Sequence, residues 1–256
     1  MNDVQNESPS HKIAIDRVGV RNLRYPIIVL DRSNEKQQTV ASVSMFVDLP
    51  ESYRGTHMSR FIEILNRHRG KMTSDQVAMV TKEMQDVFNA SQAHFKVEFD
   101  YFIEKKAPVT GHDSLLSIDC FFEGNRGDDY HFILGVRVPV LTLCPCSKEI
   151  SDRGAHNQRA YVDIQVEFEE FIWIEELVEV AEQSASAPIY PLIKRPDEKF
   201  ITELAFDNPV FVEDLARNIA KVLDSDKRIY AYKIQVESHE SIHTHNAFAC
   251  ISKFND

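Results

Sequence analysis

The sequence predicts an α+β protein made of two successive units, each with an antiparallel sheet that helices cover on one face. Three observations lead to this class. Apolar and polar residues alternate over several runs, which is typical of half-buried strands. Apolar residues at helical spacing lie between those runs. The order of strands, then helices, then strands occurs twice, although the two halves show no residue-level identity.

The first half predicts two strands, two helices and two further strands. They lie, in order, at 23–30, 43–49, 58–65, 73–88, 95–103 and 116–122. The first helix has its apolar residues at i, i+3, i+4 and i+7, one helical face. The second helix opens at Thr73, whose hydroxyl can cap it while Gln76 reaches back as in a capping box.

The second half repeats this order of elements. Strands are predicted within 130–143 and at 160–168, helices at 173–181 and 211–222, and strands at 230–236 and 247–252. Asn208 and Pro209 stand where the N-cap and the first helical residue of the later helix are expected. Strands at the edges of such sheets need partners, so we expect an oligomer.

The predicted organisation is one compact chain in three parts. Residues 1–16 are polar and aperiodic, which indicates a flexible N-terminal arm. The first unit spans 17–128 and the second spans 129–256. A chain of 256 residues is long enough to bury a core without staples.

Composition excludes several classes of protein. Lys and Arg number 29 against 40 Asp and Glu, a net charge of −11, which argues against a nucleic-acid surface. Neither a signal peptide nor an apolar run long enough to span a membrane is found. The four cysteines do not form a disulfide framework, so we expect a reducing, cytoplasmic location, with Cys120 and Cys250 as core residues.

The segment after the strand at 130–143 contains the ligand types that zinc prefers. Cys144 and Cys146 flank Pro145, and His156 follows on the same predicted loop. A structural zinc site needs four protein ligands, and no second cysteine pair is present. That shortage favours a catalytic site with an open position for water. The alternative is that both cysteines are small residues at a strand end.

A second polar cluster lies at 237–245, between the last two predicted strands. It contains three histidines and two glutamates within nine residues, among them Glu240 and His243. Histidine titrates nearest neutrality, which makes His243 a candidate general acid. The alternative is a solvated turn.

Three further positions are less specific when taken alone. Glu213 and Glu198 are consistent with solvated acids near helix starts. Arg60, with Arg54 and His57, lies where a strand passes into a helix, and such a position can bind phosphate. The alternative is that these arginines pair with the many carboxylates of the chain.

Three strings carry a resemblance to a known family. They are Leu-Pro-x-x-x-Arg-Gly-x-His-Met-Ser-Arg-Phe at 49–61, Cys-Pro-Cys-Ser-Lys-Glu-Ile-Ser at 144–151 and Gly-Ala-His-Asn-Gln-Arg at 154–159. Together they resemble GTP cyclohydrolase type IB, over nearly the whole chain from Val18 onward. The resemblance implies the tunnelling fold, with two tandem ββααββ units per subunit, in a homotetramer with active sites at subunit interfaces.

The resemblance also implies an activity and a set of residues. The family converts GTP and water to 7,8-dihydroneopterin triphosphate and formate, at the start of folate and queuosine-precursor biosynthesis. The resemblance implies that Cys144, His156 and Glu198 bind a divalent metal, Zn²⁺ or Mn²⁺, with Fe²⁺ as a further candidate. It implies that Glu213 binds the guanine and that His243 and Glu240 transfer protons. The triphosphate would bind to Lys148, Arg60 and Arg159.

Two other readings stay open at this point. One is the archaeal, iron-dependent GTP cyclohydrolase, which gives a cyclic phosphate product. The other is a non-catalytic module that binds a metal or a purine.

Overall fold

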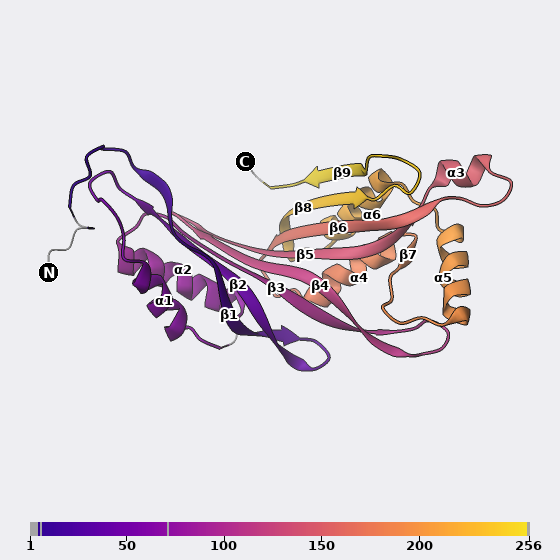
Figure 1. Ribbon diagram of the computed structural model, residues 1–256, viewed down its shortest axis with the longest axis horizontal. Coiled ribbons are helices and arrows are strands. Elements are labelled where there is room, and N and C mark those ends of the chain that lie inside the picture. The colour runs from indigo at the N-terminus through magenta and orange to yellow at the C-terminus, as the bar shows by residue number, and fades with distance from the viewer. Residues whose placement is uncertain (1–4, 6, 71, 255–256) are drawn as a thin grey trace. The chain divides into compact units, whose positions relative to one another are not determined.

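The computed structural model describes residues 5, 7–70 and 72–254. This part of the chain forms nine strands and six helices (Figure 1). The strands are β1 (Ile15–Asp31), β2 (Glu35–Leu49), β3 (Ala93–Lys106), β4 (Asp113–Arg126), β5 (Tyr130–Leu143), β6 (Asn157–Phe168), β7 (Ala187–Pro188), β8 (Ile229–Ser238) and β9 (Ala247–Ser252). The helices are α1 (Met58–Arg67), α2 (Ser74–Phe88), α3 (Pro145–Ile150), α4 (Ile174–Ser184), α5 (Arg195–Asp207) and α6 (Val212–Ser225).

The prediction of a tunnelling fold with two tandem ββααββ units, each with its own sheet, is wrong. In the described chain the strands form one antiparallel sheet in the order β1-β2-β3-β4-β5-β6-β8-β9, with β7 paired to β5. The second half also inserts α3, α5 and β7 among its elements, so it does not repeat the first. Periodicity reports the type of each element, whereas strand pairing depends on contacts far apart in the sequence.

The chain divides into two compact units, each of which is described by itself. Unit 1 comprises Met1–Asp100 and Phe121–Ile133, and unit 2 comprises Tyr101–Cys120 and Leu134–Asp256. The predicted boundary between residues 128 and 129 stays a prediction. The predicted arm lies partly outside the described residues. In its described part, the carbonyls of Gln5 and Glu7 accept hydrogen bonds from the backbone of Gly55 and Arg54.

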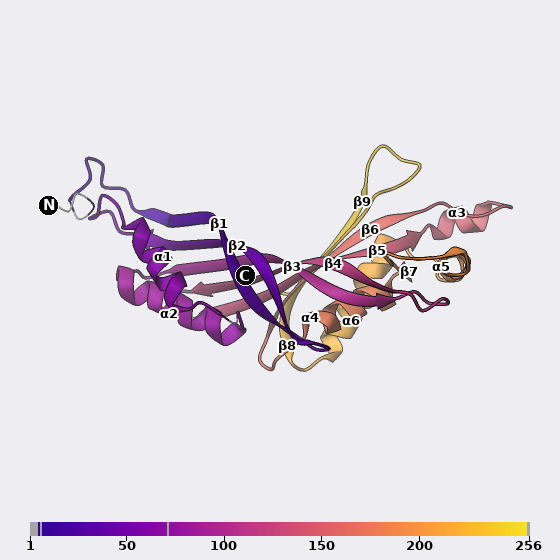
Figure 2. The same cartoon turned by 60° about the horizontal axis from the view of Figure 1, so that its bottom comes forward.

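Unit 1 confirms the predicted patterns of β2, α1 and α2. Alternate residues of β2 from Ala41 to Leu49 are buried, and β2 pairs with both β1 and β3. The helices α1 and α2 lie side by side against one face of β1 and β2 (Figures 1 and 2). Phe61 of α1 stacks on Phe88 of α2, with ring centroids 4.3 Å apart. The apolar stripes of the two helices therefore form one core with the sheet.

The predicted cap of α2 is half correct. The backbone N–H of Gln76 donates to the hydroxyl of Thr73 at 3.3 Å, as a helix cap requires. The side chain of Gln76 does not reach back to the backbone of Thr73, but binds the imidazole of His68. His68 follows the end of α1, so a tertiary contact replaces the reciprocal half of the capping box.

Unit 2 holds β6 at the centre of its sheet, between β5 and β8, and β9 pairs with β8. The helix α6 packs on β8 and β9 and contacts α4. The buried residues of β6 follow the predicted alternation, among them Ala160, Val162 and Ile164. At the end of β5, Leu143 joins Ala187 and Ala205 in a small apolar cluster that anchors α5.

A buried aspartate fixes the start of α5. The carboxylate of Asp197 accepts hydrogen bonds from the backbone of Val109 and Thr110, both at 2.8 Å, from the hydroxyl of Thr110 at 2.6 Å, and from the backbone of Lys194 at 2.9 Å. Burial would raise the pKa of this carboxyl, but these hydrogen bonds outweigh it and hold the pKa well below its usual range. Asp197 thus ties the turn between β3 and β4 to α5.

Replacing Asp197 by asparagine is expected to lower Tm by roughly 5–10 °C. The NH₂ group of asparagine replaces one of the two acceptor oxygens and cannot accept the hydrogen bonds that this oxygen receives. A depressed carboxyl pKa stabilises the folded state above the unfolded value of about 3.9, and that stabilisation is lost as the pH falls below it. In thermal melts the Tm difference between the two proteins should therefore be constant from pH 7 to about pH 5 and narrow towards pH 3 without vanishing, because the folded-state pKa lies lower still. The exposed neighbour Glu198, replaced by glutamine, is the control. A Tm difference that stayed constant down to pH 3 would contradict the assignment.

No helix in the described part of the chain combines the length and apolar character that crossing a membrane requires.

Candidate functional site

A cavity of about 250 Å³ lies in unit 2, where the ends of β5, β6 and β8 approach the first turn of α6. Its walls combine a thiol, imidazoles and carboxylates with a few apolar side chains. The lining residues are Thr142, Cys144, His156, Gln158, Val210, Phe211, Val212, Glu213, Ser238, Glu240, His243, His245 and Ala247. Usual ligand pockets measure about 300–1,000 Å³, so this cavity has room for part of a nucleotide rather than all of it.

The segment that carries Cys144 is closed by its own hydrogen bonds. The backbone N–H of Ser147 donates to Cys144 Sγ at 3.4 Å, with Pro145 as the first residue of α3. The backbone N–H of Cys144 donates to the carbonyl of His156 at 3.1 Å, and that of His156 donates to Ser147 Oγ at 3.2 Å. These contacts hold the thiol and the imidazole at the same cavity.

Three further polar residues line the cavity and were not predicted from the sequence. Thr142 and Gln158 are cross-strand partners on β5 and β6, and Ser238 ends β8 opposite Ala160. All three are buried. A signal existed, because Gln158 and Ser238 continue the apolar phase of their strands. When neighbouring strands carry polar residues at positions where the alternation places buried side chains, a polar group of side chains is expected at that end of the core.

Glu240 is held by two of these lining residues. Its Oε1 accepts hydrogen bonds from Ser238 Oγ at 2.8 Å and from Gln158 Nε2 at 3.1 Å. Its Oε2 lies 3.8 Å from Nδ1 of His156, and both side chains are mostly buried. His243 is exposed in the turn after β8, with its ring 6.5 Å from that of His156 in an edge arrangement. The fold thus brings both candidate proton-transfer residues to His156.

Glu213 lies in the first turn of α6 and lines the cavity. The predicted start of this helix at Asn208 and Pro209 is wrong, because Asn208 caps the end of α5 through Leu204 instead. The backbone N–H of Val210 donates to the carbonyl of Leu143 at 3.1 Å, which keeps this segment extended along the end of β5. The helix therefore begins at Val212, and its first turn faces the cavity.

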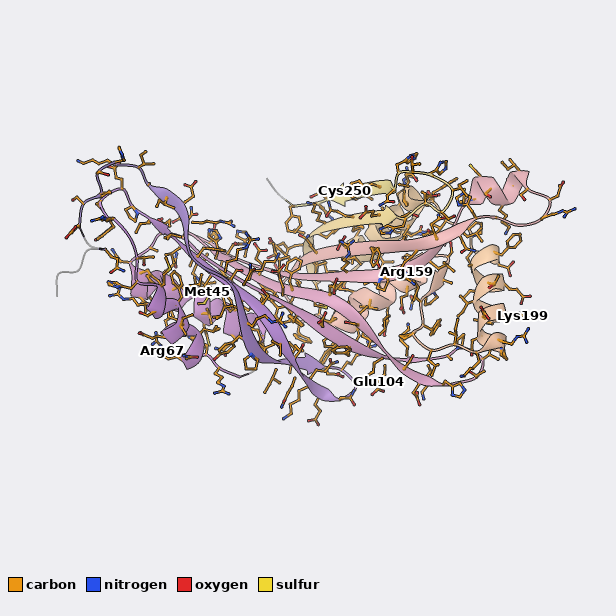
Figure 3. The ribbon with its side chains drawn as sticks, viewed as in Figure 1. Met45, Arg67, Glu104, Arg159, Lys199 and Cys250 are labelled. Carbon is orange, nitrogen blue, oxygen red and sulfur yellow. The ribbon has the colours of Figure 1, made fainter. Side chains whose placement is uncertain are left out.

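The described structure does not bring four of the predicted residues into the cavity lining. Glu198 is exposed on α5. Arg159, which Figure 3 labels, is exposed on β6. The ammonium of Lys148 binds the carbonyl of Phe206 and lies 4.4 Å above its ring. Arg60 is exposed and belongs to unit 1. Within the described residues no group of three or more His, Cys, Asp or Glu side chains is placed to hold a metal ion.

The cavity is therefore rich in acceptors and poor in cations. Two carboxylates, Glu213 and Glu240, line it, whereas none of the lining residues in the described chain is Lys or Arg. An anionic group such as a triphosphate needs cationic side chains for neutralisation. The described lining of this cavity supplies none.

A larger cavity of about 620 Å³ lies beside α4 and shares Val210 with the first. Its lining includes Glu182, which pairs with Lys105 at 2.6 Å. Burial raises the pKa of the Glu182 carboxyl, and the ammonium of Lys105 opposes that rise. This lining contains neither thiol nor imidazole in the described chain, so its chemistry is poorer than that of the smaller cavity.

The four cysteines are free and differ in exposure, with Cys120 buried, Cys144 half-buried, and Cys146 and Cys250 exposed. The prediction that Cys250 is a core residue is wrong, because alternate residues of the edge strand β9 face outward (Figure 3). The prediction for Cys120 is confirmed.

Iodoacetamide is expected to alkylate Cys146 and Cys250 first, and Cys120 only after unfolding, since access controls the rate. If Cys144 is a metal ligand, added zinc should slow its alkylation and leave the rate at Cys146 unchanged. Mass spectrometry of tryptic peptides measures all four rates. If zinc slowed the alkylation of Cys146 and not that of Cys144, Cys144 would not be the thiol ligand.

Comparisons with known proteins give consistent results. A family model described as type I GTP cyclohydrolase folE2 matches residues 1–249. The chain is 51% identical to GTP cyclohydrolase FolE2 of Kosmotoga olearia over 253 residues, which is 99% of this chain and 98% of the relative. It is 52% identical to GTP cyclohydrolase FolE2 of Pseudothermotoga lettingae over 254 residues, again 99% and 98% of the two chains.

Among solved structures, the chain is similar to a uricase from Bacillus fastidious, with a TM-score of 0.56 and 9% identity over 95% of this chain and 93% of that one. It is also similar to uricase from Arthrobacter globiformis, with a TM-score of 0.54 and 8% identity over 94% of each chain. At such low identity the likeness shows the fold alone. The fold is uricase-like, in place of the predicted tandem-unit tunnelling fold.

Proposed function

Because the chain belongs to the FolE2 family of type I GTP cyclohydrolases, we propose that the cavity of unit 2 is the site where it opens the purine ring of GTP. The chain is a GTP cyclohydrolase, converting GTP and water to 7,8-dihydroneopterin triphosphate and formate in folate biosynthesis. The family model specifies the FolE2 type, where the sequence motifs indicated type IB. One observation supports the location: Cys144, His156, Glu213 and Glu240 come from four segments and line one cavity.

The thiol of Cys144 and the imidazole of His156 fit a divalent metal by their donor chemistry. Sulfur and imidazole nitrogen are ligands that Zn²⁺ prefers, and they also suit Fe²⁺, whereas Mn²⁺ favours oxygen. We propose that this pair holds the ion and that Glu198 is the third ligand, although Glu198 lies outside the cavity lining. When bound, the ion supplies a water molecule of lowered pKa for the attack on C8 of guanine.

Glu213 is proposed to anchor the guanine base. A carboxylate accepts from the N1–H and the 2-amino group of guanine together, and adenine lacks this pair of donors. The apolar side chains of Val210, Phe211 and Val212 precede it on the same wall and suit the face of a base. This arrangement orients guanine and selects it.

Glu240 and His243 are proposed to move protons. Addition of water across C8 requires a proton on the neighbouring ring nitrogen, and an imidazole is suited to supply it near neutral pH. His243 lies at the cavity mouth, beside the ring of His156. Glu240 is fixed by Ser238 and Gln158, so its carboxylate has a defined position from which to accept a proton.

We propose that the enzyme is a homo-oligomer, a tetramer by the sequence resemblance, and that a second subunit completes the site. The cavity is too small for a whole nucleotide and its described lining holds no cation for the triphosphate. The edge strand β9 begins two residues after His245, which lines the cavity. An unpaired strand edge invites another chain. Lys148, Arg60 and Arg159 remain the proposed triphosphate ligands, from either subunit.

The proposal is tested by incubating the purified protein with GTP and Zn²⁺, Mn²⁺ or Fe²⁺ in separate reactions. Formate release together with a fluorescent linear triphosphate pterin supports it. A cyclic phosphate product, identified by mass, would point to the archaeal type of reaction. If the protein bound the metal or GTP without turnover, it would be a binding module.

We also propose a cytoplasmic location, which the four free cysteines support. A second use of the product, for queuosine precursors, is proposed as well.

A further inference from the structure

Gln158 has a contact besides the one that holds Glu240. It is 8% exposed and lies in the buried phase of β6, directly opposite Thr142 of β5. Its amide touches two site residues at once. Oε1 lies 2.9 Å from Nδ1 of His156, and Nε2 lies 3.1 Å from Oε1 of Glu240. A buried amide group that lacks a partner carries a desolvation cost, and here both ends of the amide have one.

The partners determine which way the amide points. A carboxylate offers only acceptor atoms, so the group that faces Glu240 must be the NH₂ of Gln158. The second bond of the NH₂ goes to Thr142 Oγ1 at 3.4 Å, which also accepts. The carbonyl oxygen of the amide therefore faces His156. Reversing the amide would place a lone pair against the carboxylate and break both contacts.

The amide orientation in turn determines the tautomer of His156. The carbonyl of Gln158 only accepts, so Nδ1 of His156 carries the proton and donates it. In the neutral ring Nε2 then keeps its lone pair. This is the form in which an imidazole binds a metal or accepts a proton, and the bond at the other nitrogen also fixes the plane of the ring.

We propose that Gln158 is a positioning residue that links Glu240 to His156 and holds His156 as the Nδ1–H tautomer. The inference rests on the proposed function of His156 as a ligand, and it goes beyond that function by naming the residue that prepares the ligand. Three hydrogen bonds connect these residues in series. Ser238 donates to Glu240, Gln158 donates to Glu240, and His156 donates to Gln158. Breaking it at Gln158 leaves the ligand residues themselves unchanged.

Two substitutions separate the contacts of Gln158. Gln158→Leu removes both. Gln158→Glu keeps an acceptor for Nδ1–H of His156 and loses the donor to Glu240. Gln165→Leu, half-buried on the other face of the same strand, is the matched control. Tm of each variant shows whether it folds, and Gln158→Glu keeps the test available if Gln158→Leu does not.

The first measurement uses metal-free protein labelled with ¹⁵N-histidine, in which long-range proton–nitrogen correlations report each tautomer. The His156 signals are assigned by their loss in His156→Asn. We expect the Nδ1–H tautomer in the unsubstituted protein, in Gln158→Glu and in Gln165→Leu, and a shift towards Nε2–H in Gln158→Leu. An Nε2–H tautomer in the unsubstituted protein, or no change in Gln158→Leu, would overturn the inference.

The second measurement is titration with zinc alone. Loss of a residue that orients a ligand weakens metal affinity by about 10–100-fold, which is expected for Gln158→Leu but not for Gln165→Leu. With GTP, kcat of Gln158→Leu should fall while KM stays within about twofold. Unchanged zinc affinity would contradict the inference. If the protein released no formate, the proposed function would fail while the tautomer result still stood, so the two failures are distinguishable.

Discussion

Replacing Cys144 by alanine is expected to abolish stoichiometric metal binding and to lower formate release by at least about a hundredfold. The thiol is the softest donor in the cavity, and a catalytic metal contributes several kcal/mol to the transition state. The fold should survive, because the side chain is only half-buried and its one hydrogen bond in the cap of α3 is a weak one to sulfur. Metal analysis of the purified variant and a formate assay with GTP measure the two effects.

The matched control is Cys146→Ala. Cys146 is exposed on α3, two residues away, and is not part of the cavity lining. It should retain metal and activity within about twofold. If Cys144→Ala kept tight metal and full formate release, the assignment of the site would be wrong. The same measurements on Glu198→Gln decide the third ligand, because retained metal there would remove Glu198 from the proposed set.

Replacing Glu213 by glutamine is expected to raise KM for GTP by about 10- to 100-fold and to leave metal content unchanged. A hydrogen bond to a charged group contributes about 1.5–3 kcal/mol, and glutamine cannot accept from both guanine donors. Glu213 lies on α6, whereas the proposed soft ligands lie at the end of β5 and the start of β6, so the two functions should separate. Steady-state kinetics with GTP, together with metal analysis, measure both.

The control for this variant is Asp214→Asn in the same helical turn. Asp214 pairs with Arg217 at 2.8 Å on an exposed face of α6 and is not part of the cavity lining. Its loss should change KM by less than about twofold, since an exposed ion pair within a helix contributes little. Metal loss in Glu213→Gln, or a larger effect in Asp214→Asn, would contradict the role of Glu213 as the base anchor.

Several local features could be predicted from the sequence because they depend on near neighbours. The alternation in β2, β3 and β6 and the helical spacing in α1 reflect which side chains share a face, and burial follows that face. The cap at Thr73 spans three residues and was found. The cap on α5 was not, because Asp197 also binds Val109 and Thr110, nearly ninety residues earlier.

The candidate site divides in the same way. Cys144, His156 and Glu240 were identified by their chemistry and their spacing, and the cavity lining includes all three. Gln158, Ser238 and Thr142 were missed because their importance depends on the pairing of β5, β6 and β8. The position of Glu198 outside the lining likewise follows from the packing of α5 on Leu143 and Ala187.

The sequence by itself determined that the chain is a GTP cyclohydrolase, the types of most elements and a set of candidate residues for the chemistry, since these depend on residue identity and local spacing. Only the tertiary structure decided that the strands form one sheet, that α6 begins at Val212, and that a single buried amide connects Glu240 to His156. The reason is physical. Strand pairing and hydrogen-bond direction depend on atoms brought together from distant parts of the chain, and no local pattern records which of them meet.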